Sequence, residues 1–249
     1  MDVYQKKQAH RQPQDPADVG DMWVWRALAL PSRLRVVNHL SHDRSEPEAR
    51  AFLAKFKART DGRAPFFTSD ELPAYVAALI ATYSTPEPPP VRRGPGRPRK
   101  EPRRLVDPDL RYAQVQKRRE GGRVVEVKRQ ILFGSEGDLI RVMQADGCGS
   151  RINTAYVERD NLTSRQSNGR LVRKTLSHSK RKDYLQYHLD FEDAIYNFVR
   201  PHSSLRLRLR RPGAHRRLWT PRTPAMAAGL TDHIWSMEEL LDWCSPPPC

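Results

Sequence analysis

The chain has 249 residues and, with 44 Lys or Arg against 29 Asp or Glu, carries a formal net charge of +15. This excess favours a polyanionic partner and argues against an enzyme that acts on neutral small molecules. The three cysteines are odd in number and lack Cys-x-x-Cys spacing, which argues against a disulfide framework and a zinc knuckle. No apolar run approaches the roughly 18 residues that span a bilayer, and the polar N-terminus is unlike a signal peptide. The chain is therefore expected in the reducing cytoplasm.

The first predicted elements are two strands and a helix. The runs 22–30 and 33–40 are rich in β-formers and flank a Pro-Ser turn, so they predict a hairpin. Ser45 and Glu48 have the spacing of a capping box, and apolar residues follow at the helical period. A short apolar strand, 64–69, comes next, and a second amphipathic helix follows it. Because a strand after a helix suggests a crossover connection, we expect an α/β sheet.

The middle of the chain changes in composition. Residues 84–104 are rich in proline and in basic side chains, which predicts an unfolded linker. Residues 111–134 alternate apolar and polar side chains around Gly121-Gly122, which predicts a β-hairpin. The stretch 134–150 is interpreted as a loop.

The C-terminal third is predicted to be mainly helical. Asn153 or Thr154 as an N-cap predicts a helix over 152–166, and apolar residues at the helical period predict a longer one over 179–200. A basic run from Arg206 is either an edge strand or a disordered arm. Short helices are expected to open at Thr223 and at Ser236.

Two carboxylates are candidate metal ligands. Asp70 ends a predicted strand, which is where α/β sheets place their ligand sites. Glu158 lies one turn into a predicted helix, on the face that also carries Asn161, Leu162 and Arg165, and this is not the pattern of a core face. Two or three converging carboxylates can hold two Mg²⁺ ions for phosphoryl transfer. The alternative is that Asp70 caps the next helix and that Glu158 is a solvated acid in a first helical turn.

Two basic segments are candidate DNA-binding surfaces. The linker contains a Gly-Arg-Pro tripeptide at Arg97, and its short core is similar to an AT-hook, which lies in an A·T-rich minor groove. The second segment, 165–182, follows the Glu158 helix. The candidate DNA-binding side chains of both segments are Arg97, Arg99, Lys100, Arg165, Arg170, Arg173, Lys174 and Lys180. Each segment could equally be an ordinary solvated charge run.

The motif strings in the C-terminal half carry a family resemblance. The most specific are YVERDNLTSR, which contains Glu158, and the RKT…SK pattern that follows it; FEDAIYNFVRPHSSLR and RTPAMAAGLTDHIW come later. Together with FFTSDELPAYVAAL around Asp70, these strings resemble bacterial insertion-sequence transposases of the DDE class. The resemblance covers roughly residues 3–240.

The resemblance implies an RNase-H-like fold, a mixed sheet flanked by helices, in which three acidic residues bind two Mg²⁺ ions that Mn²⁺ can replace. Asp70 matches the second acid and Glu158 the third. The first acid belongs on the first strand of the sheet, and the chain begins too late to contain it; Asp2 is out of register. At the end of the 22–30 strand, where many relatives carry an Asp, this sequence has Ala29. The chain therefore resembles an N-terminally truncated or decayed transposase.

The resemblance also divides the chain into four parts. They are an N-terminal part of the catalytic core, a basic linker with a β-hairpin insertion, a C-terminal part of the core, and a basic arm with short helices. Their bounds are 1–84, 85–134, 135–205 and 206–249.

The function implied is Mg²⁺-dependent cleavage and strand transfer of double-stranded DNA, at element terminal repeats and target DNA. A homo-oligomer on DNA, associated with the nucleoid and not with a membrane, is expected. Activity should be impaired because one acid is missing. The alternative is a catalytically dead DNA-binding remnant that competes with full-length transposase. The charge also permits an RNA- or ribosome-associated protein, but charge does not require the YVERDNLTSR string.

Overall fold

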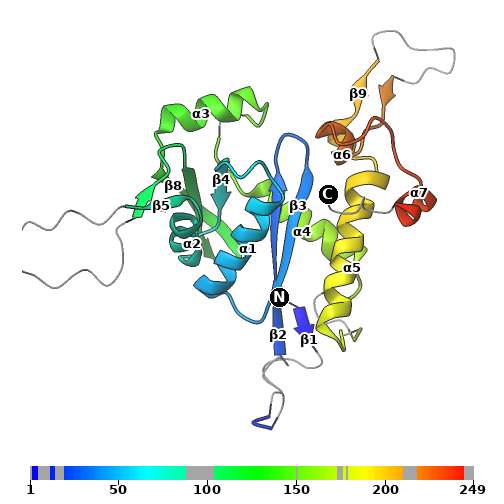
Figure 1. The fold of residues 1–249 in the computed structure, drawn as a ribbon, viewed down its shortest axis with the longest axis horizontal. Helices are drawn as coiled ribbons and strands as arrows, with labels where there is room; N and C mark the ends of the chain where they lie inside the picture. Colours follow the sequence, from blue (N-terminus) through cyan, green and yellow to red (C-terminus); the bar gives the residue numbers. More distant parts are fainter. Residues whose placement is uncertain are drawn as a thin grey trace, which may run out of the picture. The chain divides into compact units, whose positions relative to one another are not determined.

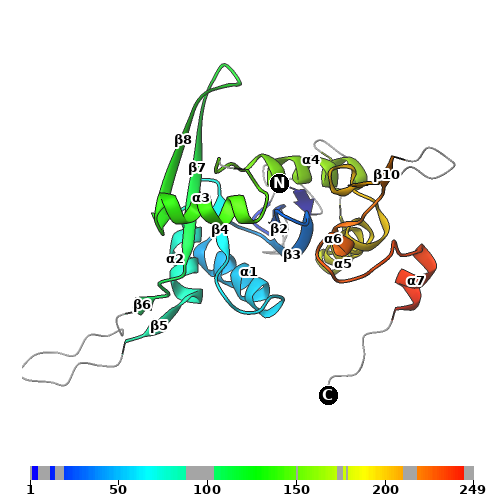
Figure 2. The same cartoon turned by 90° about the horizontal axis from the view of Figure 1, so that it is seen from above.

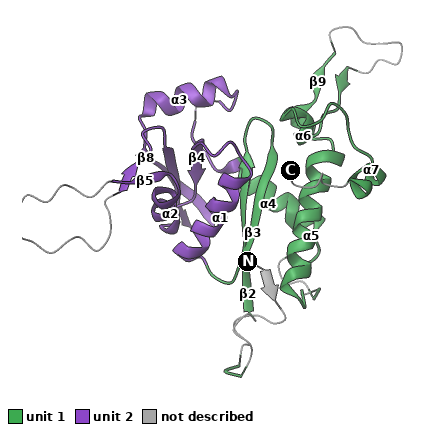
Figure 3. Ribbon diagram, in the orientation of Figure 1, with its two compact units in different colours: residues 1–43, 156–249 green, residues 44–155 purple. Residues whose placement is uncertain are grey.

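The chain forms two compact units (Figure 3). Unit 1 contains residues 1–43 and 156–249, and unit 2 contains residues 44–155. Both units mix helices and strands, which confirms the predicted α/β class. The structure is a computed structural model that describes residues 2–4, 12–14, 20–87, 104–149, 151–172, 176–177, 179–209 and 218–243.

Unit 1 is built on the antiparallel sheet β1-β2-β3. Its strands and helices, in chain order, are β1 (Asp2–Tyr4), β2 (Gly20–Ala29), β3 (Leu34–Ser41), α4 (Ala155–Ser167), α5 (Lys182–Ala194), a π-helical turn (Ile195–Val199), a 3-10 turn (Ser203–Leu205), β9 (Leu207–Arg208), β10 (Trp219–Thr220), α6 (Pro224–Ala227) and α7 (Met237–Asp242). The predicted hairpin, the two longer helices and the two short C-terminal helices are all confirmed.

Helix α5 runs beside the β2–β3 hairpin and buries its apolar face there (Figure 1). The hairpin is antiparallel and has a register shift between Ala27 and Leu28. Apolar side chains from the two strands, from α5 and from the segment before it form one core, which contains Met22, Leu40, Leu171, Leu185 and Leu189. The sheet and helix are thereby fixed to each other by hydrophobic burial.

Unit 2 contains the mixed sheet β4-β7-β8. Its strands and helices, in chain order, are α1 (Glu46–Ala58), β4 (Phe66–Ser69), α2 (Ala74–Thr82), β5 (Ser84–Pro86), β6 (Arg104–Val106), β7 (Arg111–Glu120), β8 (Arg123–Phe133) and α3 (Glu136–Ala145). Strand β4 is parallel to β7, and β7 is antiparallel to β8. The parallel pair is joined by a crossover connection that contains α2. The crossover expected through α1 is not formed, because β3 and β4 belong to different sheets.

Alternating side chains place helices on both faces of this sheet (Figure 2). On one face Phe67 packs against Phe56 of α1 and against Tyr83 behind α2, with ring centroids 5.4 and 5.7 Å apart. On the other face α3 covers the sheet, and the shared core contains Ala113, Val115, Leu139, Met143 and Ile152. The sheet is thus buried between α1 and α2 on one side and α3 on the other.

The β7–β8 hairpin turns at the predicted glycine pair. Gly121 and Gly122 have φ angles of 55° and 80°. Two successive positive φ angles are what a two-residue turn of the favoured hand requires, and glycine adopts them without steric cost. The sequence therefore located this turn correctly.

Three local expectations need correction or completion. The stretch 134–150 is not a loop, because it contains α3. Ser135 is the N-cap of this helix, and its hydroxyl accepts a hydrogen bond from the Asp138 N–H at 3.2 Å. Helix α1 begins as predicted, although the Ser45 side chain makes no cap hydrogen bond to it. The predicted linker is bounded by paired strands β5 and β6, and its residues 88–103 lie outside the described residues.

None of the helices in the described part of the chain has the length and hydrophobicity that a lipid bilayer crossing requires.

Candidate functional site

Asp70 lies directly after β4, at the carboxyl edge of the parallel β4–β7 pair. Its carboxylate is 62% exposed and forms an ion pair with Arg44 at 3.3 Å. The N-cap of α2 is Pro73, so Asp70 does not cap that helix. The structure therefore excludes the alternative that Asp70 is a helix cap. It shows an accessible carboxylate at the edge of a sheet.

The backbone of Asp70 is held by a chain of hydrogen bonds from β7. Gln114 donates to the Tyr112 hydroxyl at 3.0 Å, this hydroxyl bonds to the Ser69 hydroxyl at 2.7 Å, and Ser69 donates to the Asp70 carbonyl at 2.7 Å. Burial raises the pKa of Tyr112 and of Tyr75, and the charge of Asp70 raises both further. Both phenols therefore stay protonated at neutral pH, and the carbonyl end of Asp70 is fixed while its side chain faces water.

Glu158 lies in the first turn of α4 and is exposed. The next carboxylate along this helix, Asp160, is buried, as is Ser164 one turn later. Helix α4 therefore presents two acids to two different environments. The first-turn position and exposure of Glu158 fit both a solvated acid and a metal ligand.

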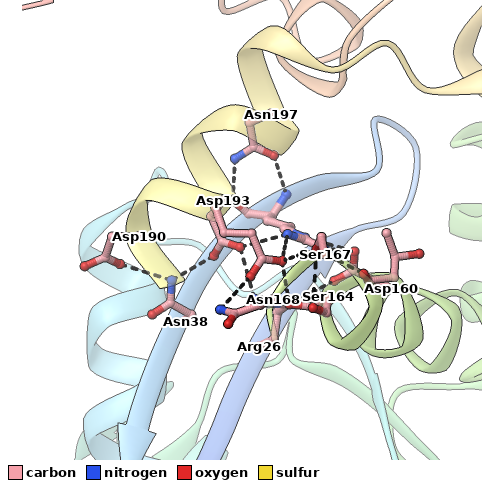
Figure 4. Close-up of polar contacts among 12 residues, drawn as sticks. Arg26, Asn38, Asp160, Ser164, Ser167, Asn168, Asp190, Asp193 and Asn197 are labelled. Atoms are coloured by element: carbon pink, nitrogen blue, oxygen red, sulfur yellow. Dashed lines mark hydrogen bonds and ion pairs between the residues drawn. The ribbon is translucent and has the colours of Figure 1, made fainter. Parts of the chain in front are cut away.

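The buried face of α4 joins an ion-pair network with β2, β3 and α5 (Figure 4). The Arg35 guanidinium, 1% exposed, donates to Asp160 at 2.9 Å, to Glu192 at 2.9 Å and to Asp193 at 3.2 Å. Arg26 donates to Asp193 at 3.1 Å and to Asp160 at 3.4 Å. Two arginines from neighbouring strands thus bind three carboxylates from two helices.

Neutral side chains complete the network. Ser164 donates to Glu192 at 2.6 Å, and Asn38 donates to Asp193 at 2.7 Å. Asn197, in the π-helical turn, binds the backbone of Arg35 through both ends of its amide, at 3.0 and 2.9 Å. Because buried charges are tolerated only when they are paired and hydrogen-bonded, these contacts fix the position of α4 and hence of Glu158.

The two acids of α5 in this network have opposite pKa shifts. Burial by itself would raise the pKa of Glu192, but the hydrogen bond from Ser164 and the charges of both arginines outweigh it and lower this pKa. Burial, with the charge of Glu192, raises the pKa of Asp193 in spite of Arg26 and Asn38. The network therefore stabilises the charge of one acid at the expense of its neighbour.

Glu192→Gln and Asp193→Asn should change the pH dependence of stability in opposite directions. In unfolded chains both types of carboxyl titrate near about pH 4. The contribution of Glu192, whose folded pKa is lowered, is present above its unfolded pKa and is lost as pH falls through the folded pKa. The contribution of Asp193, whose folded pKa is raised, is fully present below its unfolded pKa and is lost as pH rises through the folded pKa.

Urea unfolding between about pH 3 and 7 measures both effects. Relative to the wild type, the free energy of unfolding of E192Q should fall as pH rises, and that of D193N should rise. If the unfolding free energies of E192Q and D193N, each relative to the wild type, changed in the same direction with pH, the opposite pKa shifts of Glu192 and Asp193 would be contradicted.

The structure describes only some of the predicted DNA-binding side chains. Arg165, in the last turn of α4, and Arg170, in the turn after it, are half-buried, whereas Lys180 is exposed ahead of α5. The other predicted side chains lie outside the described residues, namely Arg97, Arg99, Lys100, Arg173 and Lys174. The DNA-binding role of all of them remains a prediction.

Sequence reasoning missed Arg26, Arg35, Asp160 and Asp193. Arg26 and Arg35 lie within the apolar runs that predicted the β2–β3 hairpin. Their position in these runs could have indicated buried ion pairs, because an arginine that is buried in a strand must be paired. Nothing local indicated which carboxylates would pair with them.

Asp70 belongs to unit 2 and Glu158 to unit 1. Within the described residues, no three His, Cys, Asp or Glu side chains lie close enough together to hold a metal ion. Ala29 ends β2, opposite Leu34. The chemistry of both exposed carboxylates still fits Mg²⁺, which prefers oxygen ligands.

Comparison with known proteins does not assign the chain to a family. No protein-family model matches it, and no curated protein or solved structure is significantly similar to it.

Proposed function

We propose that the protein is of the DDE transposase lineage, with an RNase-H-like core, and binds double-stranded DNA. In this proposal Asp70 and Glu158 bind Mg²⁺, for which Mn²⁺ can substitute. The motif strings around both carboxylates and the net charge of +15 support it. Assembly as a homo-oligomer on paired DNA ends belongs to the same proposal.

The observation that carries the proposal is that two accessible carboxylates, Asp70 and Glu158, belong to segments whose backbone positions are fixed by hydrogen bonds and ion pairs. Asp70 follows a parallel strand at its carboxyl edge, where open α/β sheets bind ligands. Glu158 is exposed on a helix whose other face is fixed by Asp160 and its buried ion pairs. Bound Mg²⁺ ions would supply an activated nucleophile and stabilise the leaving oxygen in phosphodiester cleavage and strand transfer.

Ala29 supports a second candidate function, DNA binding without efficient cleavage. The resemblance expects an acid at the end of β2 in many relatives, and a methyl group cannot bind a metal ion. A protein with two of three carboxylates would occupy DNA ends and compete with a complete transposase.

Adding a carboxylate at the end of β2 should raise cleavage. We expect Ala29→Asp to nick supercoiled plasmid DNA at least about tenfold faster than the wild type in Mg²⁺ or Mn²⁺, because each carboxylate fixes the coordination of an ion. Ala29→Asn, which has the same shape without the charge, is the matched control and should leave the rate unchanged. Gel separation of supercoiled, nicked and linear plasmid measures the rate.

Two further substitutions assign the metal ligands. In the Ala29→Asp background, Asp70→Asn or Glu158→Gln should remove nicking and leave the Kd for DNA within about threefold, since neither neutral amide replaces a carboxylate as a Mg²⁺ ligand. Nicking that survives both substitutions would overturn their assignment. DNA binding without nicking in every variant would select the second candidate function.

A further inference from the structure

The β7–β8 hairpin extends past the core of unit 2 as a two-stranded ribbon (Figure 2). Val115 is the last buried residue of β7, and its partner across the ladder is Arg129. From Arg118 through the turn to Arg129 every side chain is exposed. Among the described residues, this part of the ribbon buries no side chain, and an isolated two-stranded hairpin is only marginally stable in water.

The end of the ribbon is strongly basic. Residues 117–129 contain six Lys or Arg and two Glu, a formal excess of four positive charges. They also contain three exposed valines: Val124, Val125 and Val127 are 45%, 48% and 39% exposed. Apolar side chains exposed among cations offer contact area to a partner, and the positive charge favours an anionic one.

The ladder register separates the charges onto two faces. Residues directly opposite share a face, and successive pairs alternate. The pairs Lys117–Val127 and Arg119–Val124 therefore share one face, which we call the tip face. The register shift beyond Arg118 leaves Val125 as the extra residue of a bulge.

The opposite face of the ribbon is nearly neutral. Arg118 forms ion pairs there with Glu120 at 3.2 Å and with Glu126 at 3.6 Å. Both acids of the ribbon are thus on this face, together with Arg123, opposite Glu120, and Lys128, opposite Gln116. The tip face carries two cations, two valines and no acid, and Arg129, opposite Val115, lies on the same side nearer the core.

We propose that the tip face enters the major groove of B-form DNA. That groove, about 12 Å wide, admits a two-stranded ribbon, and its floor carries thymine methyl groups that apolar side chains contact. Lys117 and Arg119 would bind phosphates or guanine edges, and Val124 and Val127 would contact the methyls. The deep, narrow major groove of A-form RNA does not admit side chains in this way. The inference rests on the proposed function for its partner and assigns DNA to a surface that contains neither candidate metal ligand.

A pair of double variants tests the tip face. Lys117→Gln with Arg119→Gln removes two charges from it, and Arg118→Gln with Arg123→Gln removes two from the opposite face of the same ribbon. Fluorescence anisotropy with a labelled 30-base-pair DNA duplex, without divalent metal, measures Kd at several salt concentrations. The tip-face variant should bind at least about tenfold more weakly, and the slope of log K against log salt should shrink by about 1.8 if both cations contact phosphates. The opposite-face variant should stay within about threefold of the wild type.

A second measurement tests the valines. Replacing deoxythymidine by deoxyuridine in the duplex removes only the methyl groups, and wild-type affinity should fall about threefold to fourfold for each thymine methyl that a valine covers. Val124→Thr with Val127→Thr, which replaces one methyl of each side chain by a hydroxyl, should lower affinity for the thymine duplex and reduce this difference.

The outcomes separate this inference from the proposed function. If the wild type binds DNA and the two double variants are weakened equally or not at all, or if a double-stranded RNA of the same sequence binds as tightly, the tip-face inference fails and the proposed function stands. If the wild type binds no DNA, both fail.

Discussion

Replacing Arg35 by methionine should lower the free energy of unfolding by about 3–5 kcal/mol, because one partner of a buried ion pair is removed and the others stay. The Arg35 guanidinium is 1% exposed and contacts Asp160, Glu192 and Asp193. Without it, three buried carboxylates would share the charge of Arg26 alone. Methionine fills a comparable volume, so the loss would report charge and not a cavity.

Tryptophan fluorescence reports this unfolding within one unit. All five tryptophans of the chain, at positions 23, 25, 219, 235 and 243, belong to unit 1. Their urea transition therefore follows the unit that contains Arg35, whatever unit 2 does.

Arg181→Met is the matched control for Arg35→Met, because Arg181 belongs to the same unit. Arg181 also pairs with an aspartate, but its side chain and that of Asp183 are 60% and 42% exposed. The unfolding free energy should stay close to that of the wild type, as for other surface ion pairs. Equal losses in the two variants would show that burial of the network does not determine its contribution.

Asn197→Ala should lower the free energy of unfolding by about 2–4 kcal/mol, because it leaves two buried backbone groups without partners. Strand β3 is an edge of the sheet β1-β2-β3, and the N–H and carbonyl of Arg35 both bond to Asn197, at 3.0 and 2.9 Å. The amide of Asn197 thus takes the place of a missing neighbouring strand. The π-helical turn positions it, since Arg200 N–H bonds to the carbonyl of Ile195, five residues earlier.

Hydrogen exchange at the Arg35 amide measures this contact directly. The amide should exchange much faster in Asn197→Ala. Asn161→Ala, a substitution on α4, is the control, and it should change neither the opening free energy at the Arg35 amide nor the free energy of unfolding by more than about 0.5 kcal/mol. An Arg35 amide that stays protected in Asn197→Ala would contradict the proposed role.

Both substitutions also bear on the candidate metal ligand of α4. Asp160, two residues after Glu158, is a partner of Arg35, and Ser164 is a partner of Glu192. Loss of Arg35 would therefore loosen the support that orients Glu158. In the Ala29→Asp background, we expect Arg35→Met to lower nicking at temperatures where unit 1 is still folded.

Glu158 was a candidate site residue in the sequence analysis, whereas Asp160, on the same helix, was not. The motif string singled out Glu158, and the structure places it in solvent. The same string gave no sign that Asp160, two positions along, is buried among arginines. Neighbouring acids on a helix point in different directions, and which direction is inward depends on what packs there.

The local sequence was sufficient to predict the elements whose formation depends on residues close together in the chain. The Gly121-Gly122 turn, the β2–β3 hairpin and the helices α1, α2, α4 and α5 follow from local steric preferences and apolar periods. Among the α-helices of the described residues, only α3 was missed, where a serine cap and an apolar pair four residues apart, Leu139 and Met143, were the signal. The strands β5 and β6 were also missed, because their residues lie within the predicted linker.

Tertiary packing selects which charges meet. Arg35 lies 125 positions from Asp160 and 158 from Asp193, and Asn197 binds its backbone across 162 positions. No local period contains such pairings, because they arise only when α4 and α5 pack against the sheet and water is excluded from between them. The cost of burying an unpaired charge then selects these partners, and this selection acts only in the folded chain.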